Sequence, residues 1–119
     1  MSMHREIYLI TGLDIQPYLN DDWEEWKESI EGENIIGNFS KGKITIIEDL
    51  MGGDYIYLGY IHANIEDDED VFEVIDIGGH KVDVWQELIN LHKQGLISEE
   101  NINKLVHVPC KQILFTHYY

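Results

Sequence analysis

Short runs of β-branched and aromatic residues, several of them alternating with polar residues, recur along this chain and are typical of strands. Five segments carry this pattern: residues 6–11, 43–50, 55–65, 71–77 and 111–118. The second and third segments are joined by residues 51–54, where Gly52 and Gly53 permit the positive φ of a hairpin turn. A further short strand is expected at residues 34–39. The economical arrangement of the middle segments is a meander of three antiparallel strands.

Three other segments repeat their apolar residues at helical spacing. The first is expected to run from a cap at Asn20 or Asp21 to about residue 31, the second from Asp83 to Gly95, and the third from Ser98 to about residue 106. The resulting order, β-α-β-β-β-α-α-β, predicts an α+β fold. We expect a mainly antiparallel sheet of four to five strands with helices packed on one face. At 119 residues, the whole of 1–119 is expected to form a single compact domain.

The net charge of the chain says more about its possible classes of function than any sequence motif does. The chain holds 23 acidic and 8 basic side chains, which gives a formal net charge of −15. Direct nucleic-acid binding is disfavoured, because neutralising phosphates takes more Lys and Arg than this chain has. With 44% hydrophobic residues, the chain still has enough apolar material to fold. A charge this large opposes folding through self-repulsion, which favours a role in solubility or in binding a basic partner.

Two features bear on the cellular compartment. No apolar run approaches the roughly 18 residues of a membrane span, and the first residues lack the apolar stretch of a signal peptide. The single Cys110 cannot form an internal disulfide, which agrees with a reducing compartment. We therefore expect a cytoplasmic protein with no membrane association. Cys110 follows Pro109 and precedes a strand, so it is expected to be an unreactive structural residue.

The first predicted helix separates its apolar and acidic residues onto opposite faces. At 100° per residue, an arc of about 60° contains four apolar residues: Leu19, Trp23, Trp26 and Ile30. An arc of about 120° on the other side contains five carboxylates: Asp21, Glu24, Glu25, Glu28 and Glu31. Side chains three and four positions apart lie about 5–6 Å from each other, comparable to successive phosphates, so this stripe could imitate a nucleic-acid backbone. The alternative is an ordinary solvated helix face, although only Lys27 interrupts the acids.

A second acidic block follows the third predicted strand. Residues 66–76 hold seven carboxylates and no basic residue. The block begins with five consecutive acids: Glu66, Asp67, Asp68, Glu69 and Asp70. Calcium binding is disfavoured, because the alternating oxygen ligands and the distal Glu of an EF-hand are missing. The block is either a solvated loop at a hairpin end or an extension of the acidic surface of the first helix.

The sequence gives little support to a catalytic or metal site. Its six histidines stand at spacings that match no zinc signature: His4, His62, His80, His92, His107 and His117. We expect no bound metal and no other cofactor. His62 and His117 lie in predicted strands, and a small acid–base site would form if they converged with Asn64 or Tyr119. His92 lies on the apolar side of its helix and is expected to be a structural histidine.

Tyrosines concentrate in the predicted strands. Tyr55 and Tyr57 fall on one face with Gly59 by alternation. They either complete a half-buried sheet face or, if that face is uncovered, provide an interface for a homodimer or another partner.

These patterns together predict a small, acidic, non-enzymatic binding protein. Its carboxylates would engage a basic protein, such as the nucleic-acid channel of a nucleic-acid-processing enzyme. DNA-mimic inhibitors of the phage counter-defence type, including anti-CRISPR and anti-restriction proteins, share this physical character. Two alternatives stay open. One is an immunity protein that neutralises a basic toxin nuclease, and the other is a nucleotide- or small-molecule-binding domain or enzyme with its site near His62.

Overall fold

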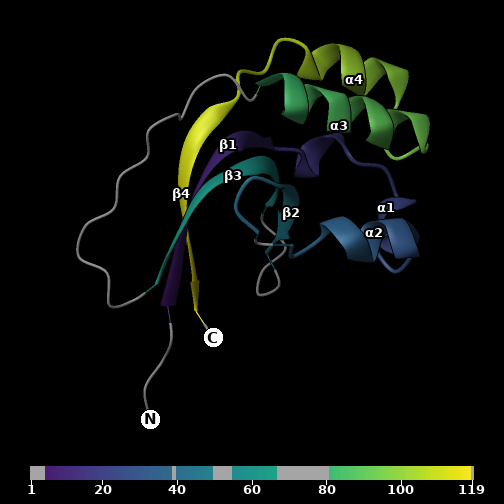
Figure 1. The fold of residues 1–119 in the computed structure, drawn as a ribbon. Coiled ribbons are helices and arrows are strands. Elements are labelled where there is room, and N and C mark those ends of the chain that lie inside the picture. Colours follow the sequence, from purple (N-terminus) through teal and green to yellow (C-terminus); the bar gives the residue numbers. More distant parts are fainter. Residues whose placement is uncertain (1–4, 39, 50–54, 67–80, 119) are drawn as a thin grey trace.

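A four-stranded antiparallel sheet is the central element of the computed structural model, which describes residues 5–38, 40–49, 55–66 and 81–118 (Figure 1). Its strands are β1 (Arg5–Asp14), β2 (Ile44–Glu48), β3 (Ile56–Glu66) and β4 (Lys111–Tyr118). They lie in the order β2-β3-β1-β4, so the first and last of these strands in the chain are neighbours. The predicted α+β class is confirmed.

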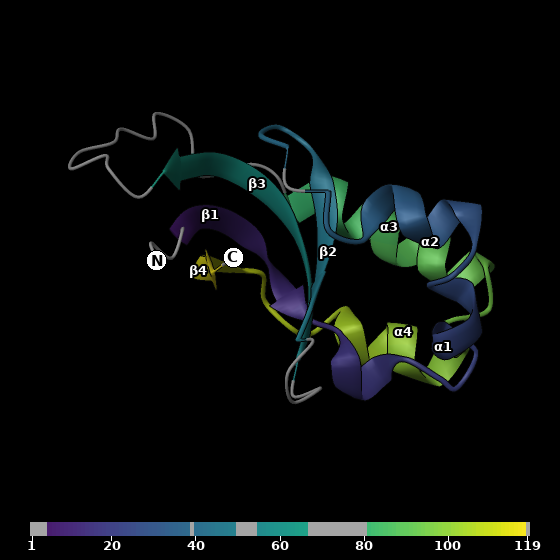
Figure 2. The ribbon, with the colours of Figure 1, turned by 90° about the horizontal axis from the view of Figure 1, so that it is seen from below.

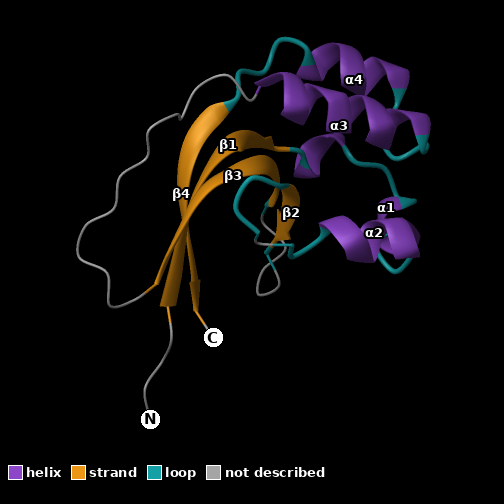
Figure 3. Cartoon of the chain, in the orientation of Figure 1, coloured by secondary structure: helices purple, strands orange, loops and turns teal. Residues whose placement is uncertain are grey.

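The helices of the described residues gather on one side of the sheet. They are the 3-10 helix η1 (Gln16–Tyr18) and the α-helices α1 (Trp23–Trp26), α2 (Ile30–Ile35), α3 (Lys81–Lys93) and α4 (Glu99–Leu105). Figures 2 and 3 show them toward one end of a curved sheet, with β1, β3 and β4 extending beyond them. Within the described part of the chain, no helix combines the length and the apolar character needed to cross a bilayer.

Two apolar clusters lie on opposite faces of the sheet. The larger one joins strand residues to three residues of α3 that are at most 1% exposed: Val84, Leu88 and Leu91. The smaller one is built around buried strand residues: Tyr8, Ile10, Ile47 and Ile61. Because Tyr8 and Ile10 alternate with residues on the helical side, β1 contributes to both clusters, which explains its central place in the sheet.

Glycine permits the close pairing of β1 with β3. Gly12 lies opposite Gly59, and a Cβ on Gly12 would collide with the carbonyl oxygen of Leu58. Three residues earlier on β1, the register shifts between Leu9 and Ile10. This shift is a β-bulge, and the extra residue that it inserts into β3 is His62.

Caps predicted from the sequence end α3 and begin α4. Gly95 has a φ of 86°, and the N–H groups of Gly95 and Leu96 each donate a 3.0 Å hydrogen bond to a carbonyl of α3, which is the Schellman arrangement. The hydroxyl oxygen of Ser98 accepts a hydrogen bond from the N–H of Asn101 at 3.1 Å and caps α4. Asp83, expected at the start of α3, lies inside it, since the helix begins two residues earlier.

The strand expected at residues 34–39 is wrong. Helix α2 continues through Ile35, and Ile36 forms only an isolated parallel bridge to Ile46. The hydroxyl of Thr45 donates to the carbonyl of Ile35 at 3.2 Å, so the helix ends against β2. The turn at residues 51–54 and the strand expected at residues 71–77 lie outside the described residues. The antiparallel pairing of β2 with β3 agrees with the predicted hairpin.

Glu87 of α3 should make stability depend on pH. Burial raises the pKa of its carboxyl above the usual value, against a smaller opposite effect of the Asn90 amide. A raised pKa in the folded state stabilises the fold below the unfolded pKa of about 4.3, and this contribution is lost as pH rises through the folded pKa. Glu87→Gln should therefore raise the melting temperature at pH 7, and the gain should vanish below about pH 4.

The exposed Glu99 provides the control for this measurement, because its charge lies in the first turn of α4, where the helix dipole favours an anion. Glu99→Gln should leave the melting temperature unchanged or lower it. A Glu87→Gln protein that melts at the parent temperature at both pH values would contradict the prediction.

Candidate partner-binding surface

The single helix expected over residues 21–31 is wrong, because the chain breaks at Ser29 into α1 and α2. Ser29 has an extended backbone, with φ −75° and ψ 168°, and its hydroxyl oxygen accepts a hydrogen bond from the N–H of Gly32 at 3.2 Å. The same hydroxyl donates to the carbonyl of Trp26 at 2.6 Å. Ser29 is thus the N-cap of α2, and Gly32 lies inside that helix. The predicted carboxylates do not form one regular stripe, so the likeness to phosphate spacing is lost.

The break also divides the apolar face that the helical periodicity predicts. Trp23 is 4% exposed, and its ring centroid lies 5.4 Å from that of the half-buried Trp26. The indole N–H of Trp26 donates to the Gln94 side chain at 2.6 Å. Ile30, expected on the same face, is 76% exposed. Of the apolar face predicted from the sequence, Trp23 and Trp26 of α1 therefore pack against the core, whereas Ile30 of α2 does not.

Amide and backbone groups hold the start of this region against the α3–α4 connection. The side-chain amide of Asn20 donates to the carbonyl of Gly95 at 2.6 Å, and its oxygen accepts a hydrogen bond from the N–H of Asp22 at 3.0 Å. Leu19 forms an isolated antiparallel bridge with Ile97. These bonds place α1 without using the carboxylates that follow.

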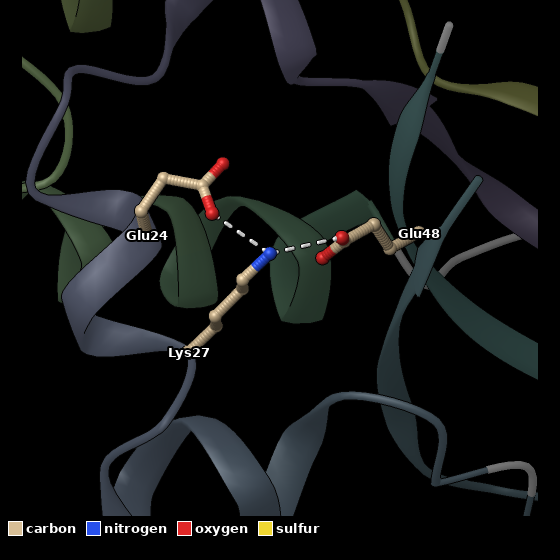
Figure 4. Close-up of polar contacts among 3 residues, drawn as sticks. All are labelled: Glu24, Lys27 and Glu48. Atoms are coloured by element: carbon tan, nitrogen blue, oxygen red, sulfur yellow. Dashed lines mark hydrogen bonds and ion pairs between the residues drawn. The ribbon is translucent and has the colours of Figure 1, made fainter. Parts of the chain in front are cut away.

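Lys27 is half-buried between α1 and β2, and it pairs with one of the exposed acids. Its ammonium lies 2.8 Å from a carboxylate oxygen of Glu24 and 3.2 Å from one of Glu48 on β2 (Figure 4). The Lys27 side chain is 27% exposed. The hydrogen bond to Glu24 raises the pKa of Lys27 above its ordinary value, against the opposite effect of burial, and the hydrogen bond to Glu48 adds to the rise. Lys27 thus links α1 to β2.

Residues 21–33 form what we term the acidic surface. All seven of its carboxylates are exposed: Asp21, Asp22, Glu24, Glu25, Glu28, Glu31 and Glu33. The five acids predicted in this segment are among them. Sequence reasoning missed Asp22 and Glu33 because it followed one arc of a single helix, whereas a plain count of acids along the segment would have found both.

A hollow of about 250 Å³ lies beside α1. Three carboxylates contribute to its lining, from Asp21, Glu24 and Glu48, together with the polar side chains of Gln16 and Asn20. Its apolar lining comes from three further residues: Leu19, Trp23 and Ile56. Lys27 pairs with Glu24 and Glu48, so these three charges sum to −1. With Asp21 the hollow still keeps a negative charge beside apolar surface, which suits a long cationic side chain.

Glu66 is the only residue of the five consecutive acids that the structure describes, and it does not lie near the acidic surface. Glu66 ends β3, whereas Ile56, at the start of the same strand, lines the hollow beside α1. Ten residue steps of extended chain separate the two by about 30 Å, and Figure 1 shows this end of β3 away from α1 and α2. Asp67, Asp68, Glu69 and Asp70 lie outside the described residues, so their role stays a prediction.

His62 is engaged within the sheet. It is 6% exposed, its Nε2 lies 2.5 Å from the hydroxyl oxygen of Thr11, and its ring packs edge-on against Tyr60 at 5.2 Å. The register places His117 opposite Glu6, about three residues or 10 Å along β1 from the bulge that contains His62. The backbone therefore does not bring His62 and His117 together.

A second hollow, of about 270 Å³, lies between α3, α4 and the start of β4 and is lined mainly by apolar residues. His62 lines neither of the two hollows. Among the described residues, no three His, Cys, Asp or Glu side chains are grouped so that they could hold a metal ion. Nδ1 of His92 lies 2.7 Å from the carbonyl oxygen of Ile97, which agrees with the structural role predicted for it.

The tyrosines predicted on one sheet face lie against the smaller apolar cluster. The rings of Tyr55 and Tyr57 are 5.0 Å apart, and Tyr55 meets Phe115 of β4 edge-on at 6.0 Å. Burial raises the pKa of the Tyr55 phenol, with a further contribution from the Asp49 charge. Both tyrosines are half-buried, which agrees with a sheet face completed by aromatic side chains.

Comparison with protein-family models, with curated proteins and with solved structures gives no match to this chain. Its function must therefore be inferred from the geometry and charge of its own surface.

Proposed function

We propose that this protein is a non-enzymatic binding protein whose acidic surface engages a basic patch on a partner protein. The observation that carries the proposal is the exposure of all seven carboxylates of residues 21–33, while the one lysine among them is drawn between α1 and β2. A one-sign surface of this kind steers a basic partner toward it and repels acidic ones. The proposed setting is the cytoplasm.

The hollow beside α1 supports a partner that presents arginine or lysine. A guanidinium can bond a carboxylate at two points, and its aliphatic stem can pack on an apolar lining such as Trp23. Nucleic-acid channels are lined with basic side chains that neutralise phosphates. Inhibition of a nucleic-acid-processing enzyme through such a channel is therefore the role that we propose. It rests on the density of exposed charge rather than on regular helical spacing.

Two double variants with the same change in net charge test this proposal. Glu25→Lys/Glu28→Lys alters the acidic surface, and Glu99→Lys/Glu100→Lys alters the exposed start of α4; each takes the formal charge from −15 to −11. All four residues are exposed, so each substitution should change stability by at most about 1 kcal/mol, with the larger losses at Glu99 and Glu100, where the helix dipole favours an anion. The partner is first captured from cells that carry the gene, identified by mass spectrometry and purified.

Calorimetry then compares binding of the purified partner to the parent and to both variants. We expect the Glu25→Lys/Glu28→Lys protein to bind about 10- to 100-fold more weakly, and the Glu99→Lys/Glu100→Lys protein to bind as the parent does. Equal affinity of all three proteins, or affinity that is unchanged between about 0.05 and 0.5 M salt, would overturn the proposal. The captured partner also separates the subclasses. A restriction or CRISPR nuclease identifies an anti-defence inhibitor, and a toxin nuclease identifies an immunity protein.

A further inference from the structure

Strand β4 is the end of the described sheet, beside β1, and it differs in charge from the rest of the chain. Residues 104–118 contain no Asp or Glu, although the chain has 23 acids. Leu114, in the middle of β4, is 64% exposed. A long edge strand with an exposed apolar residue is a template for pairing with another strand. Among the described strands, β4 is also where two copies of this acidic chain would meet with least repulsion.

The order of polar and apolar residues along β4 is symmetric about Leu114. On one side stand Lys111, Gln112 and Ile113, and on the other stand Phe115, Thr116 and His117. An antiparallel pair of β4 strands centred on Leu114 places apolar opposite apolar, at Ile113 and Phe115. It also places polar opposite polar, at Gln112 and Thr116. Shifting the centre by one residue in either direction, which changes the register by two residues, places an apolar residue opposite a polar one at two positions or more, so this register is favoured.

The same register continues the apolar rows of the sheet. On one face, Leu114 lies beside Leu9 of β1, which lies beside Ala63 of β3. On the other face, Ile113 lies beside Ile10, which lies beside Ile61. A second copy would extend the first row through its own Leu114 and the second row through its Phe115. Both faces of the sheet would thus be continuous across the junction.

We propose that two copies of this chain associate through antiparallel pairing of their β4 strands about a two-fold axis at Leu114, which joins the four described strands of each copy into one continuous sheet. This contact is independent of the acidic surface, which α1 and α2 carry on another part of the molecule (Figure 1). The dimer would present two acidic surfaces. It differs from the tyrosine-face interface considered from the sequence, since Leu114 points to the opposite face from the cluster that contains Phe115.

Sedimentation velocity over about 1 μM to 1 mM tests the association, because weak dimers dissociate within this range. The parent should sediment as a dimer at high concentration. Leu114→Lys places two ammonium groups opposite each other and should leave a folded monomer, since the exposed side chain is not needed by the isolated fold. Ile30→Lys adds the same charge at a 76% exposed residue and should remain dimeric. A monomeric parent, or equal behaviour of the two variants, would overturn the proposal.

Cysteine cross-linking tests the register, in a Cys110→Ser background that removes the natural thiol. Leu114→Cys should oxidise to a symmetric disulfide, since directly opposed residues of antiparallel strands have Cα atoms about 4.5–5.5 Å apart. Thr116→Cys would lie opposite position 112 and about 13 Å from its own copy, so it should not cross-link by itself. Cross-linking at Thr116→Cys as fast as at Leu114→Cys would exclude the proposed pairing.

Discussion

Replacing Trp23 with alanine should lower the free energy of unfolding by about 3–5 kcal/mol, the range measured when buried tryptophan is truncated. Trp23 is 4% exposed and belongs to the larger apolar cluster, where it packs beside Trp26. The total stability of a domain of this size is about 5–15 kcal/mol, so the variant would lose a large share of it. Urea denaturation followed by far-ultraviolet circular dichroism measures the loss.

Trp26→Phe is the matched control for this substitution. It keeps an aromatic ring at a half-buried position, removes the indole N–H that donates to Gln94 and makes the ring smaller. We expect a loss of about 1 kcal/mol, the usual net value of one hydrogen bond. From helical periodicity alone, Trp26 would be expected to anchor the segment as firmly as Trp23. Equal losses for Trp23→Ala and Trp26→Phe would contradict the assignment of Trp23 as the main anchor.

Elements with strong local signals could be predicted from the sequence. The last strand, residues 111–118, was predicted with the limits that β4 has, because an apolar run after a proline marks its start. The start of α4 at Ser98 and the end of α3 at Gly95 depend on capping side chains and a positive φ, which act within a few residues. Such signals do not need the rest of the fold to be known.

The break at Ser29 shows where periodicity misleads. Leu19, Trp23, Trp26 and Ile30 repeat at helical spacing, which predicts one continuous helix. Serine in the middle of that pattern was the opposing signal, because its hydroxyl can cap a new helix as well as continue an old one. Tertiary contacts decide between the two outcomes. With Lys27 bound to Glu48 of β2, α1 is held in place, and α2 can start in a new direction.

The sheet order could not be predicted, since pairing of β1 with both β3 and β4 joins residues far apart in the chain. The acids of residues 21–33 could be predicted as exposed, because charged side chains are rarely buried without partners. Their arrangement could not, because it depends on the break at Ser29 and on the inward turn of Lys27. The hollow beside α1 also required the structure, since Glu48 and Ile56 come from other elements.

Gly32→Ala should destabilise the protein by about 1–3 kcal/mol, the range for forcing extra volume into a packed site. Helix propensity alone predicts the opposite, because alanine is favoured over glycine inside a helix by about 1 kcal/mol. An added Cβ on Gly32 would collide with the Trp26 carbonyl oxygen and lie 2.8 Å from the Cα of Lys27. Both obstacles are backbone atoms, so relief requires α2 to move away from α1.

Asn34→Ala separates these two effects, because Asn34 is exposed in the same helix and its replacement changes propensity without a collision. This control should be neutral or slightly stabilising in urea denaturation. If Gly32→Ala is as stable as Asn34→Ala, the close contact between α1 and α2 is not present in solution. If the Gly32→Ala protein is destabilised as expected, the close contact between α1 and α2 also sets the spacing of the carboxylates on these two helices. Partner binding should then weaken even when the variant is fully folded, because the carboxylates of α1 and α2 have moved relative to one another. The substitution itself removes no charge.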